Sequence, residues 1–286
     1  DYIINTTEDV LVLLRASGMK LTNEKPPNYK SSTLLKIQEI LTNGNLKELQ
    51  LLEEEPKTKS IAELITLPDI GPSHANRLYE LGITSIADLK LHLQDNPELL
   101  NRKQLIGLRN YRDLQKRIPR EEMDKWSKLL ITLSNMVFNK LKPKISIIHM
   151  ELSGSYRRGQ DTSGDVDFYI AVDNPRPEIM DELLKLLVKL KVINSNDIIC
   201  QGAKKTMAVA RLNPSSLARH LDIFIFSKQQ YPFALMFATG SGEFNIKFRK
   251  HALTKGWSLC EKDLRKKPLI KGGPKGDIPD QPTLMT

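Results

Sequence analysis

The chain has 286 residues, of which 40% are hydrophobic and 27% are charged, and these proportions are typical of a globular protein. Its 43 Lys and Arg residues outnumber its 34 Asp and Glu residues, so the formal charge of +9 favours a polyanionic partner such as nucleic acid or an anionic membrane surface. Two cysteines exclude a disulfide framework and a tetrahedral cysteine zinc site, and no apolar run approaches the roughly 20 residues of a membrane-spanning helix.

Residues 1–52 are predicted to form a small helical region. No signal-peptide pattern leads the chain, so we expect an intracellular protein without a membrane partner. Helical patterns at residues 8–15 and 34–41 flank a polar stretch, and its proline-containing part at residues 26–30 is predicted to be a loop. The charged residues 53–57 are predicted to be the linker that follows.

Residues 53–121 are predicted to form an all-helical module. Its turn at residues 67–73 (Leu-Pro-Asp-Ile-Gly-Pro-Ser) joins two short helices. Gly82 lies where the second of these helices should end, because glycine readily adopts the left-handed conformation that follows many helices. Ser85, with Asp88 three residues later, has the spacing of a helix N-cap.

The remaining chain is predicted to be a mixture of strands and helices. Apolar residues recur every three or four positions at residues 122–141, which predicts a helix. Strand-like runs rich in Ile, Val and Phe lie at residues 145–152, 166–172, 207–212 and 221–226, and an amphipathic helix is predicted at residues 178–190. This alternation favours an α/β layer with a buried sheet. The last fifty residues combine a predicted helix at residues 244–253 with a basic tail rich in Gly and Pro.

A first motif with chemical potential is the turn at residues 154–159 (Gly-Ser-Tyr-Arg-Arg-Gly), which follows a predicted strand. A tight turn there would expose backbone N–H groups, a serine hydroxyl and two guanidinium groups. Such groups bind phosphate oxygens well, so the motif is consistent with a triphosphate cradle. An ordinary surface turn is the alternative interpretation of this motif alone.

A second motif is the pair of carboxylates Asp165 and Asp167 at the start of a strand. Side chains alternate along a strand, so the two should point to the same face with Cα atoms about 7 Å apart. Two such carboxylates repel each other and resist burial unless a cation lies between them. Oxygen ligands together with substrate phosphates suit Mg²⁺ or Mn²⁺. Two solvated carboxylates at a strand end are the alternative.

A third motif is Asp222, a lone carboxylate within an apolar strand. It is either a buried, paired aspartate or a third metal ligand from a neighbouring strand. Two metal ions held by three carboxylates can activate an attacking 3′ oxygen and stabilise leaving pyrophosphate. In that arrangement, Asp222 is expected nearest the 3′ hydroxyl group and is a candidate acceptor of its proton.

Together these motifs resemble the nucleotidyltransferase superfamily, and longer stretches narrow the resemblance to family X DNA polymerases, the polymerase beta-like family. The stretches that carry it are residues 117–123, 154–159, 164–167 and 239–253, within a likeness that extends from about residue 58 to 275. The resemblance implies an α+β fold in four parts. These are a reduced lyase-like helical region at residues 1–52, a helical DNA-binding subdomain with a helix-hairpin-helix at 53–121, a nucleotidyltransferase palm with a mixed sheet and helices at 122–230, and a small α/β nucleotide-selection subdomain at 231–286.

The resemblance also implies roles for individual residues. The metal-binding triad for two Mg²⁺ ions, for which Mn²⁺ can substitute, would be Asp165, Asp167 and Asp222. Contacts to the nucleotide would come from Gly154, Ser155, Arg158, Gly164, Phe237, Gly240 and Asn245. Contacts to DNA would come from Gly71, Ser73 and Arg249, with Na⁺ or K⁺ at the hairpin.

The hairpin at residues 67–73 supports DNA binding on physical grounds as well. Gly71 would let the backbone approach a DNA phosphate, and the N–H groups at the start of the following helix would point at it. Such contacts position DNA without reading its sequence. An ordinary turn between two helices is the alternative.

Two positions and the amino-terminal region depart from the family pattern. Phe237-Ala238 stands where an aromatic pair is usual, which leaves discrimination against ribonucleotides open. His220 stands where polymerase beta carries Arg, so we expect weaker and pH-dependent charge support for Asp222. Lys36 falls where the Schiff-base lysine of a lyase domain would lie, but the region looks shortened, and an exposed helix lysine is the alternative.

The expected function is addition of dNTPs to the primer 3′ end of gapped or primer-template DNA, by a monomer that fills short gaps in DNA repair such as base excision repair. The expected location is the nucleus, or a virion or infected-cell compartment for a viral protein. The alternatives are a template-independent or ribonucleotide-tolerant terminal transferase, a transferase acting on RNA ends, and a DNA end-binding scaffold with an inactive palm. The hairpin and residues 239–253 argue against RNA ends, and the complete carboxylate triad argues against the scaffold.

Overall fold

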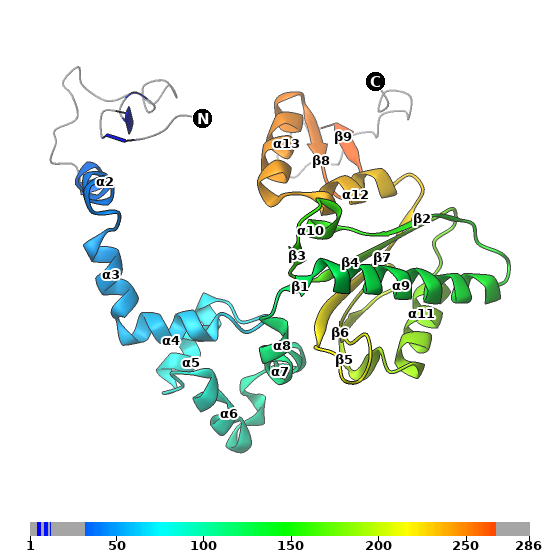
Figure 1. The fold of residues 1–286 in the computed structure, drawn as a ribbon, viewed down its shortest axis with the longest axis horizontal. Helices are drawn as coiled ribbons and strands as arrows, with labels where there is room; N and C mark the ends of the chain where they lie inside the picture. Colours follow the sequence, from blue (N-terminus) through cyan, green and yellow to red (C-terminus); the bar gives the residue numbers. More distant parts are fainter. Residues whose placement is uncertain (1–4, 7–8, 11, 13–31, 267–286) are drawn as a thin grey trace. The chain divides into compact units, whose positions relative to one another are not determined.

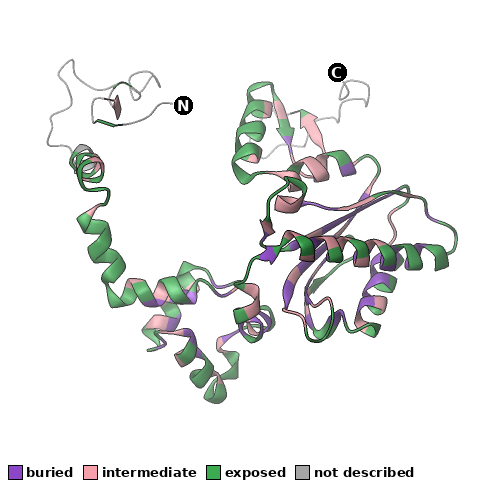
Figure 2. Ribbon diagram, in the orientation of Figure 1, coloured by how far each residue is buried: buried purple, intermediate pink, exposed green. Residues whose placement is uncertain are grey.

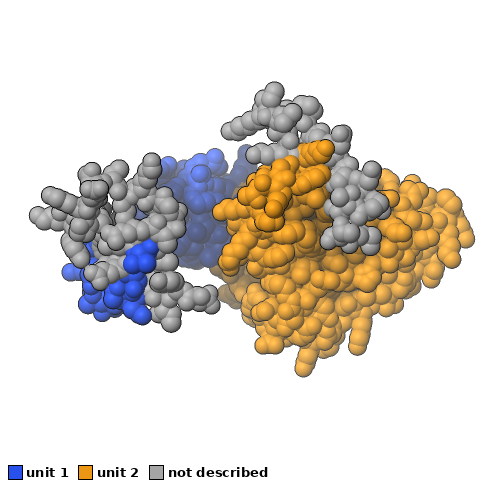
Figure 3. Space-filling model, turned by 90° about the horizontal axis from the view of Figure 1, so that it is seen from above, with its two compact units in different colours: residues 1–99 blue, residues 100–286 orange. Residues whose placement is uncertain are grey.

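The computed structural model describes residues 5–6, 9–10, 12 and 32–266 (Figure 1). The chain divides into two compact units, residues 1–99 and residues 100–286 (Figure 3). The proline-containing stretch at residues 26–30 and the basic tail after residue 266 lie outside the described residues, as does most of the helix predicted at 8–15. Among the described residues, no helix has both the length and the apolar character needed to cross a membrane.

The described part of the first unit is helical, as predicted. Its elements are α2 (Ser32–Asn43), α3 (Lys47–Glu54), α4 (Pro56–Leu64), α5 (Pro72–Glu80), α6 (Ile86–Asp95) and the 3₁₀ turn η1 (Pro97–Leu99). The side chains of α3 are all exposed, whereas α4, α5 and α6 bury apolar side chains (Figure 2). A packed core in this unit therefore lies on α4 to α6 and on the turns between them.

Local sequence signals in this unit have the expected structural effect. Ser85 is the N-cap of α6 and its side chain accepts a hydrogen bond from the backbone N–H of Asp88 at 3.0 Å. Gly82 follows α5 with φ of +83°, the left-handed conformation predicted for it.

The linker predicted at residues 53–57 is wrong, because α3 ends at Glu54 and α4 begins at Pro56. Proline is compatible with a first helical position, since the N–H group that it lacks would have no partner within the helix.

The second unit is built around a five-stranded mixed sheet with strand order β2-β4-β7-β6-β5 (Figure 1). The strands are β2 (Ile147–Leu152), β4 (Val166–Val172), β5 (Ile193–Gln201), β6 (Lys205–Ala210) and β7 (Arg219–Ser227). β4 and β7 are parallel, and the other neighbouring strands are antiparallel. Four of the five strands were predicted; β5 was not, because it is a polar edge strand with two shifts in its register.

Two helices cover one face of this sheet. They are α9 (Arg120–Lys140) and α11 (Pro177–Lys189), and both were predicted within two residues. Between helices and sheet lies the main core, which includes the fully buried Trp126, Phe168 and Ile223. Because side chains alternate along a strand, Asp167 and Asp222 point to the opposite face. That face carries a second apolar cluster, in which Tyr169 packs with Tyr231 of α12 (Tyr231–Thr239).

Shorter elements complete the second unit. Before the sheet come α7 (Arg102–Arg109), α8 (Tyr111–Leu114) and β1 (Ile118–Pro119), and β1 pairs with β3 (Thr162–Ser163). After the sheet, α12 is followed by α13 (Gly242–Thr254) and a two-stranded sheet of β8 (Trp257–Leu259) and β9 (Leu264–Lys266). The described part of the chain after residue 230 thus contains two helices and a two-stranded sheet.

Candidate active site

Three carboxylates meet where β4 and β7 begin their parallel pairing. In this ladder Asp167 is the direct partner of Asp222, so the two carboxylates stand side by side on the face opposite the main core. Asp165 precedes Asp167 by two residues just before β4. The structure therefore places the predicted triad at one end of two adjacent strands.

This arrangement is electrostatically unfavourable without a positive charge. Burial raises the pKa of Asp167 to about 7, and the charges of Asp165 and Asp222 act in the same direction. Burial and the charge of Asp222 also raise the pKa of Asp165, although His220 opposes them. Asp222 is buried and Asp167 is half-buried, so a cation bound among these carboxylates would relieve an unfavourable arrangement of like charges.

Two cationic side chains face Asp222. Lys205 Nζ lies 3.8 Å from Asp222 Oδ2, and His220 Nε2 lies 2.9 Å from Asp222 Oδ1. Burial alone lowers the pKa of His220, but the contact with Asp222 and the negative charges of the triad outweigh burial and raise it. His220 thus lies where a protonated imidazole would offset the negative charge of Asp222.

The carboxylates match divalent metal ions in donor chemistry. Asp222 Oδ1 is buried and accepts no hydrogen bond of regular geometry from the described residues, despite its contact with His220. Carboxylate oxygens of this kind suit Mg²⁺ or Mn²⁺. In the part of the chain that the structure describes, however, no three His, Cys, Asp or Glu side chains are already arranged around a common metal position. The residues needed are adjacent, and their side chains would have to turn toward a shared ion.

The glycine-serine turn lies directly beside the triad. Its first four residues form the short helix α10 (Gly154–Arg157) rather than an open turn. Gly154 has φ of +64°, and a Cβ atom there would lie 3.1 Å from Asp167 Oδ2. Glycine is therefore required both for the backbone conformation and for the close approach to the carboxylate. The Ser155 hydroxyl donates to Ser163 Oγ at 3.0 Å.

Both arginines of this turn reach Thr239 at the end of α12. Arg158 Nη1 donates to the Thr239 carbonyl oxygen at 2.6 Å, and Arg157 Nη1 donates to Thr239 Oγ1 at 3.1 Å. The next residue, Gly240, has φ of +65°, and a Cβ atom there would lie 3.3 Å from Arg158 Nη1. Two predicted nucleotide-binding segments that are about eighty residues apart in the sequence are therefore in contact.

The other predicted contact residues of this unit lie on α12, on α13 and before β4. The side chain of Asn245 donates to the Phe237 carbonyl oxygen at 2.7 Å, so it connects α13 to α12. Arg249 is exposed on α13. Gly164 lies between β3 and β4, where a Cβ atom would be 3.5 Å from Arg117 Nη1.

Several residues support the site through contacts that the sequence did not specify. Arg117 donates to the Thr162 carbonyl oxygen at 2.7 Å, and Arg120 donates to the Tyr156 carbonyl oxygen at 3.0 Å. Arg219, at the start of the strand that carries Asp222, is buried and binds Glu122 through two hydrogen bonds of 2.8 and 2.6 Å. The resemblance marks residues 117–123 as a stretch, but the sequence does not identify the partners of these arginines.

In the first unit, the predicted hairpin joins α4 to α5. The left-handed residue of this turn is Asp69, with φ of +64°, whereas Gly71 is the extended N-cap of α5. A Cβ atom at Gly71 would meet nothing within 4 Å, so packing within the chain does not require glycine there. Ser73 is exposed in the first turn of α5. Lys36 lies on α2 with a half-exposed side chain paired with Glu48, which is an ordinary arrangement for a helix lysine, and its lyase role stays a prediction.

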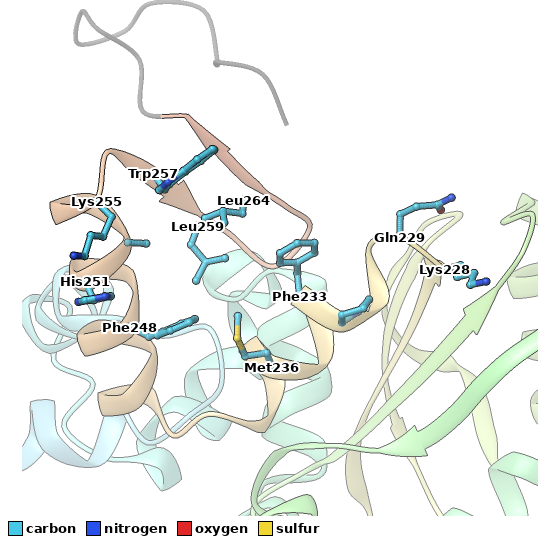
Figure 4. A pocket seen from close by; sticks show the side chains of 12 residues that line it. Lys228, Gln229, Phe233, Met236, Phe248, His251, Lys255, Trp257, Leu259 and Leu264 are labelled. Atoms are coloured by element: carbon cyan, nitrogen blue, oxygen red, sulfur yellow. The ribbon is translucent and has the colours of Figure 1, made fainter. Parts of the chain in front are cut away.

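A separate cavity of about 690 Å³ lies between α12, α13, β8 and β9 (Figure 4). Apolar side chains make up most of its lining, among them Phe233, Met236, Phe248, Trp257, Leu259 and Leu264. It contains no carboxylate and none of the predicted triad or phosphate-binding residues. The chemistry of a metal-dependent transfer is therefore assigned to the carboxylate site rather than to this apolar cavity.

Comparisons with known proteins match two stretches of the chain to domains of DNA polymerases. Residues 117–228 match the model of the DNA polymerase beta palm, and residues 63–115 match that of the fingers domain of DNA polymerase lambda. The chain is 31% identical over 240 residues to DNA polymerase lambda of Arabidopsis thaliana, covering 80% of the chain and 43% of that protein.

Two further curated relatives extend this picture. DNA polymerase lambda of Rattus norvegicus is 32% identical over 235 residues, covering 79% of the chain and 38% of that protein. The DNA polymerase/3'-5' exonuclease PolX of Bacillus subtilis is 24% identical over 234 residues, covering 79% of the chain and 38% of that protein. The match thus spans less than half the length of each of these relatives.

Proposed function

The chain belongs to the family X DNA polymerases, and we propose that it adds dNTPs to the 3′ end of a primer in gapped or primer-template duplex DNA. The observation that carries this proposal is the direct pairing of Asp167 with Asp222 in the parallel ladder, beside a turn that offers Ser155 and Arg158. The two relatives named DNA polymerase lambda support DNA as the substrate. Filling of short gaps during repair, including base excision repair, is part of the same proposal.

In this proposal Asp165, Asp167 and Asp222 hold two Mg²⁺ ions, for which Mn²⁺ can substitute. When bound, such ions activate the attacking 3′ oxygen and stabilise the leaving pyrophosphate. The raised pKa values of Asp165 and Asp167 support the assignment, because bound cations would offset both the burial and the repulsion between carboxylates that raise them. Lys205 and His220 contribute positive charge at Asp222.

The incoming dNTP would lie between α10 and the end of α12. Ser155, Arg158 and the backbone of Gly164 would contact its triphosphate, because a hydroxyl, a guanidinium and an N–H group all donate to phosphate oxygens. Gly240 and Phe237 would lie near the sugar, and Asn245 near the base. The contact between the two arginines and Thr239 supports a single nucleotide site formed by both segments.

The DNA itself would be held by contacts that do not read sequence. Gly71 and Ser73 at the start of α5 would meet a backbone phosphate, with Na⁺ or K⁺ at the hairpin, and Arg249 would lie near the template strand. The formal charge of +9 supports such contacts. We propose a monomer that acts in the nucleus, or in a virion or infected-cell compartment for a viral protein.

The test is extension of a labelled primer on a one-nucleotide gapped duplex with Mg²⁺ and single dNTPs. The wild type should add the nucleotide complementary to the template. Asp222→Asn should abolish addition, whereas Asp181→Asn, which changes an exposed carboxylate on α11, should leave it intact. Tight DNA binding by a wild type that adds nothing would contradict the proposal and favour a DNA end-binding scaffold.

A second candidate activity is tolerance of ribonucleotides or of an absent template. It is favoured by Ala238, which packs beside the apolar cluster of Tyr169 and Tyr231 at the position where the resemblance leads one to expect an aromatic side chain. The preference for dNTP over rNTP should be smaller in the wild type than in Ala238→Phe. Equal preference in the two proteins, with strict use of the template, would remove this candidate.

A further inference from the structure

A three-way carboxylate contact lies at the edge of the sheet, outside the predicted triad. Glu151 belongs to the edge strand β2, pairs with Tyr169 of β4 in the ladder, and has a side chain that is only 23% exposed. Its Oε2 atom accepts a hydrogen bond from Arg157 Nε at 2.8 Å. Its Oε1 atom accepts one from the Tyr231 hydroxyl at 2.8 Å and lies 2.9 Å from His149 Nε2.

These contacts join three elements that are separate in the sequence. Arg157 belongs to α10, the helix of the phosphate-binding turn, and Tyr231 is the first residue of α12. Glu151 therefore ties the sheet edge both to the turn and to the helix that ends in Thr239. Charge-assisted hydrogen bonds of this length are among the stronger polar contacts in proteins.

Arg157 extends the connection to the far end of α12. While its Nε atom is held by Glu151, its Nη1 atom donates to Thr239 Oγ1 at 3.1 Å. The carbonyl oxygen of the same threonine accepts from Arg158 at 2.6 Å. Thr239 is thus held from two sides, and Arg157 spans the distance between Glu151 and the Thr239-Gly240 segment.

We propose that Glu151 is a positioning residue for the incoming nucleotide, acting through Arg157 and Tyr231. It holds Tyr231, at the start of α12, against β2 and, through Arg157, it holds Thr239, at the end of α12, against α10. It also holds Arg157 away from the phosphates, so that Arg158 presents the guanidinium that meets them. This inference rests on the proposed function, because it assigns the nucleotide to the space beside α10 and Thr239. The carboxylate triad itself makes none of these contacts.

The effect should fall on nucleotide binding rather than on the chemical step. Removing the charge of Glu151 frees Arg157 and leaves Thr239 with one arginine contact fewer, while Asp165, Asp167 and Asp222 keep their environment. Hydrogen bonds to charged groups are among the stronger ones, and the partial exposure of Glu151 and Arg157 weakens them, so a dNTP affinity about three- to tenfold weaker is expected.

The experiment is single-turnover extension of a one-nucleotide gap over a range of dNTP concentrations, which separates the dNTP Kd from the maximal rate. Glu151→Gln should raise the dNTP Kd about three- to tenfold with a maximal rate within about twofold of the wild type. Tyr231→Phe should raise the Kd by less, because Arg157 keeps its carboxylate partner. Glu182→Gln, which removes an exposed carboxylate on α11, is the matched control and should match the wild type.

A double-mutant cycle with Arg157→Gln separates positioning from a general loss of stability. Because the two residues act as one unit, the double variant should bind dNTP no more weakly than the worse single variant, and all variants should melt at similar temperatures. If Glu151→Gln melts early, the exposed Arg157→Gln variant carries the same prediction for the dNTP Kd.

Two results would overturn the inference: an unchanged dNTP Kd in Glu151→Gln or Arg157→Gln, and a fall in the maximal rate without a change in Kd. Failure of the proposed function is a different result, because the wild type itself would then show no extension.

Discussion

The two faces of the central sheet use the same strands for opposite purposes. On one face Phe168 and Ile223 are fully buried beneath α9 and α11. On the other face their immediate neighbours Asp167 and Asp222 stand side by side, and burial together with the charge of Asp222 raises the pKa of Asp167. The difference shows how the alternation of a strand lets a rigid apolar core hold like-charged groups together that would otherwise separate.

The largest expected effect comes from Asp167→Asn on the carboxylate face. Primer extension should fall by at least about 10²–10³-fold, because a group that stabilises charge in the transition state is lost. The free energy of unfolding should stay the same or rise, since the change removes a buried charge that faces two other carboxylates. Gapped-primer extension and urea unfolding of the same preparation measure both quantities, and a large loss of stability would contradict this view of the site.

The adjacent substitution Phe168→Ala should have the opposite pattern. It creates a cavity in the main core, so the free energy of unfolding should fall by about 3–5 kcal/mol. Activity per folded molecule should change far less than in Asp167→Asn. Urea unfolding gives the two free energies of unfolding, and extension assays normalised to the folded fraction give the two activities. Equal free energies of unfolding in Phe168→Ala and Asp167→Asn would contradict the contrast between the two faces.

A smaller effect is expected at two glycines of the phosphate-binding turn. Gly154 and Gly159 both have positive φ, of +64° and +78°, but only at Gly154 would a Cβ atom approach a carboxylate oxygen. Both alanine variants should lose about 1–3 kcal/mol of stability through backbone strain. Only Gly154→Ala should also slow extension at saturating dNTP, and equal rates in the two variants would show that the close approach to Asp167 has no role.

The main elements of the second unit follow from sequence patterns because each buries a regular set of apolar side chains. β4 begins and ends at the predicted residues, since its apolar run is bounded by Asp165 and Asp173, which leaves little freedom in its limits. β5 could not be found in this way, because Asn194, Ser195 and Asn196 lie exposed at the sheet edge and give no periodic signal.

The neighbourhood of the site was only partly accessible from the sequence. The spacing of Asp165 and Asp167 predicts a shared face, but the register that puts Asp222 opposite Asp167 depends on how two distant strands pair. The contacts of Arg157 and Glu151 depend on side-chain directions within α10 and β2, which composition and periodicity do not specify. Such side-chain networks are therefore the part that the structure adds.

The central claim is that the three carboxylates together hold the divalent ions of a nucleotidyl transfer. The most direct test is to measure Mn²⁺ binding by electron paramagnetic resonance, with a dideoxy-terminated gapped primer and the complementary dNTP present. The wild type should bind two Mn²⁺ ions per chain at these sites, and Asp167→Asn should bind fewer or bind them much more weakly. Equal stoichiometry and affinity in the two proteins would contradict the claim.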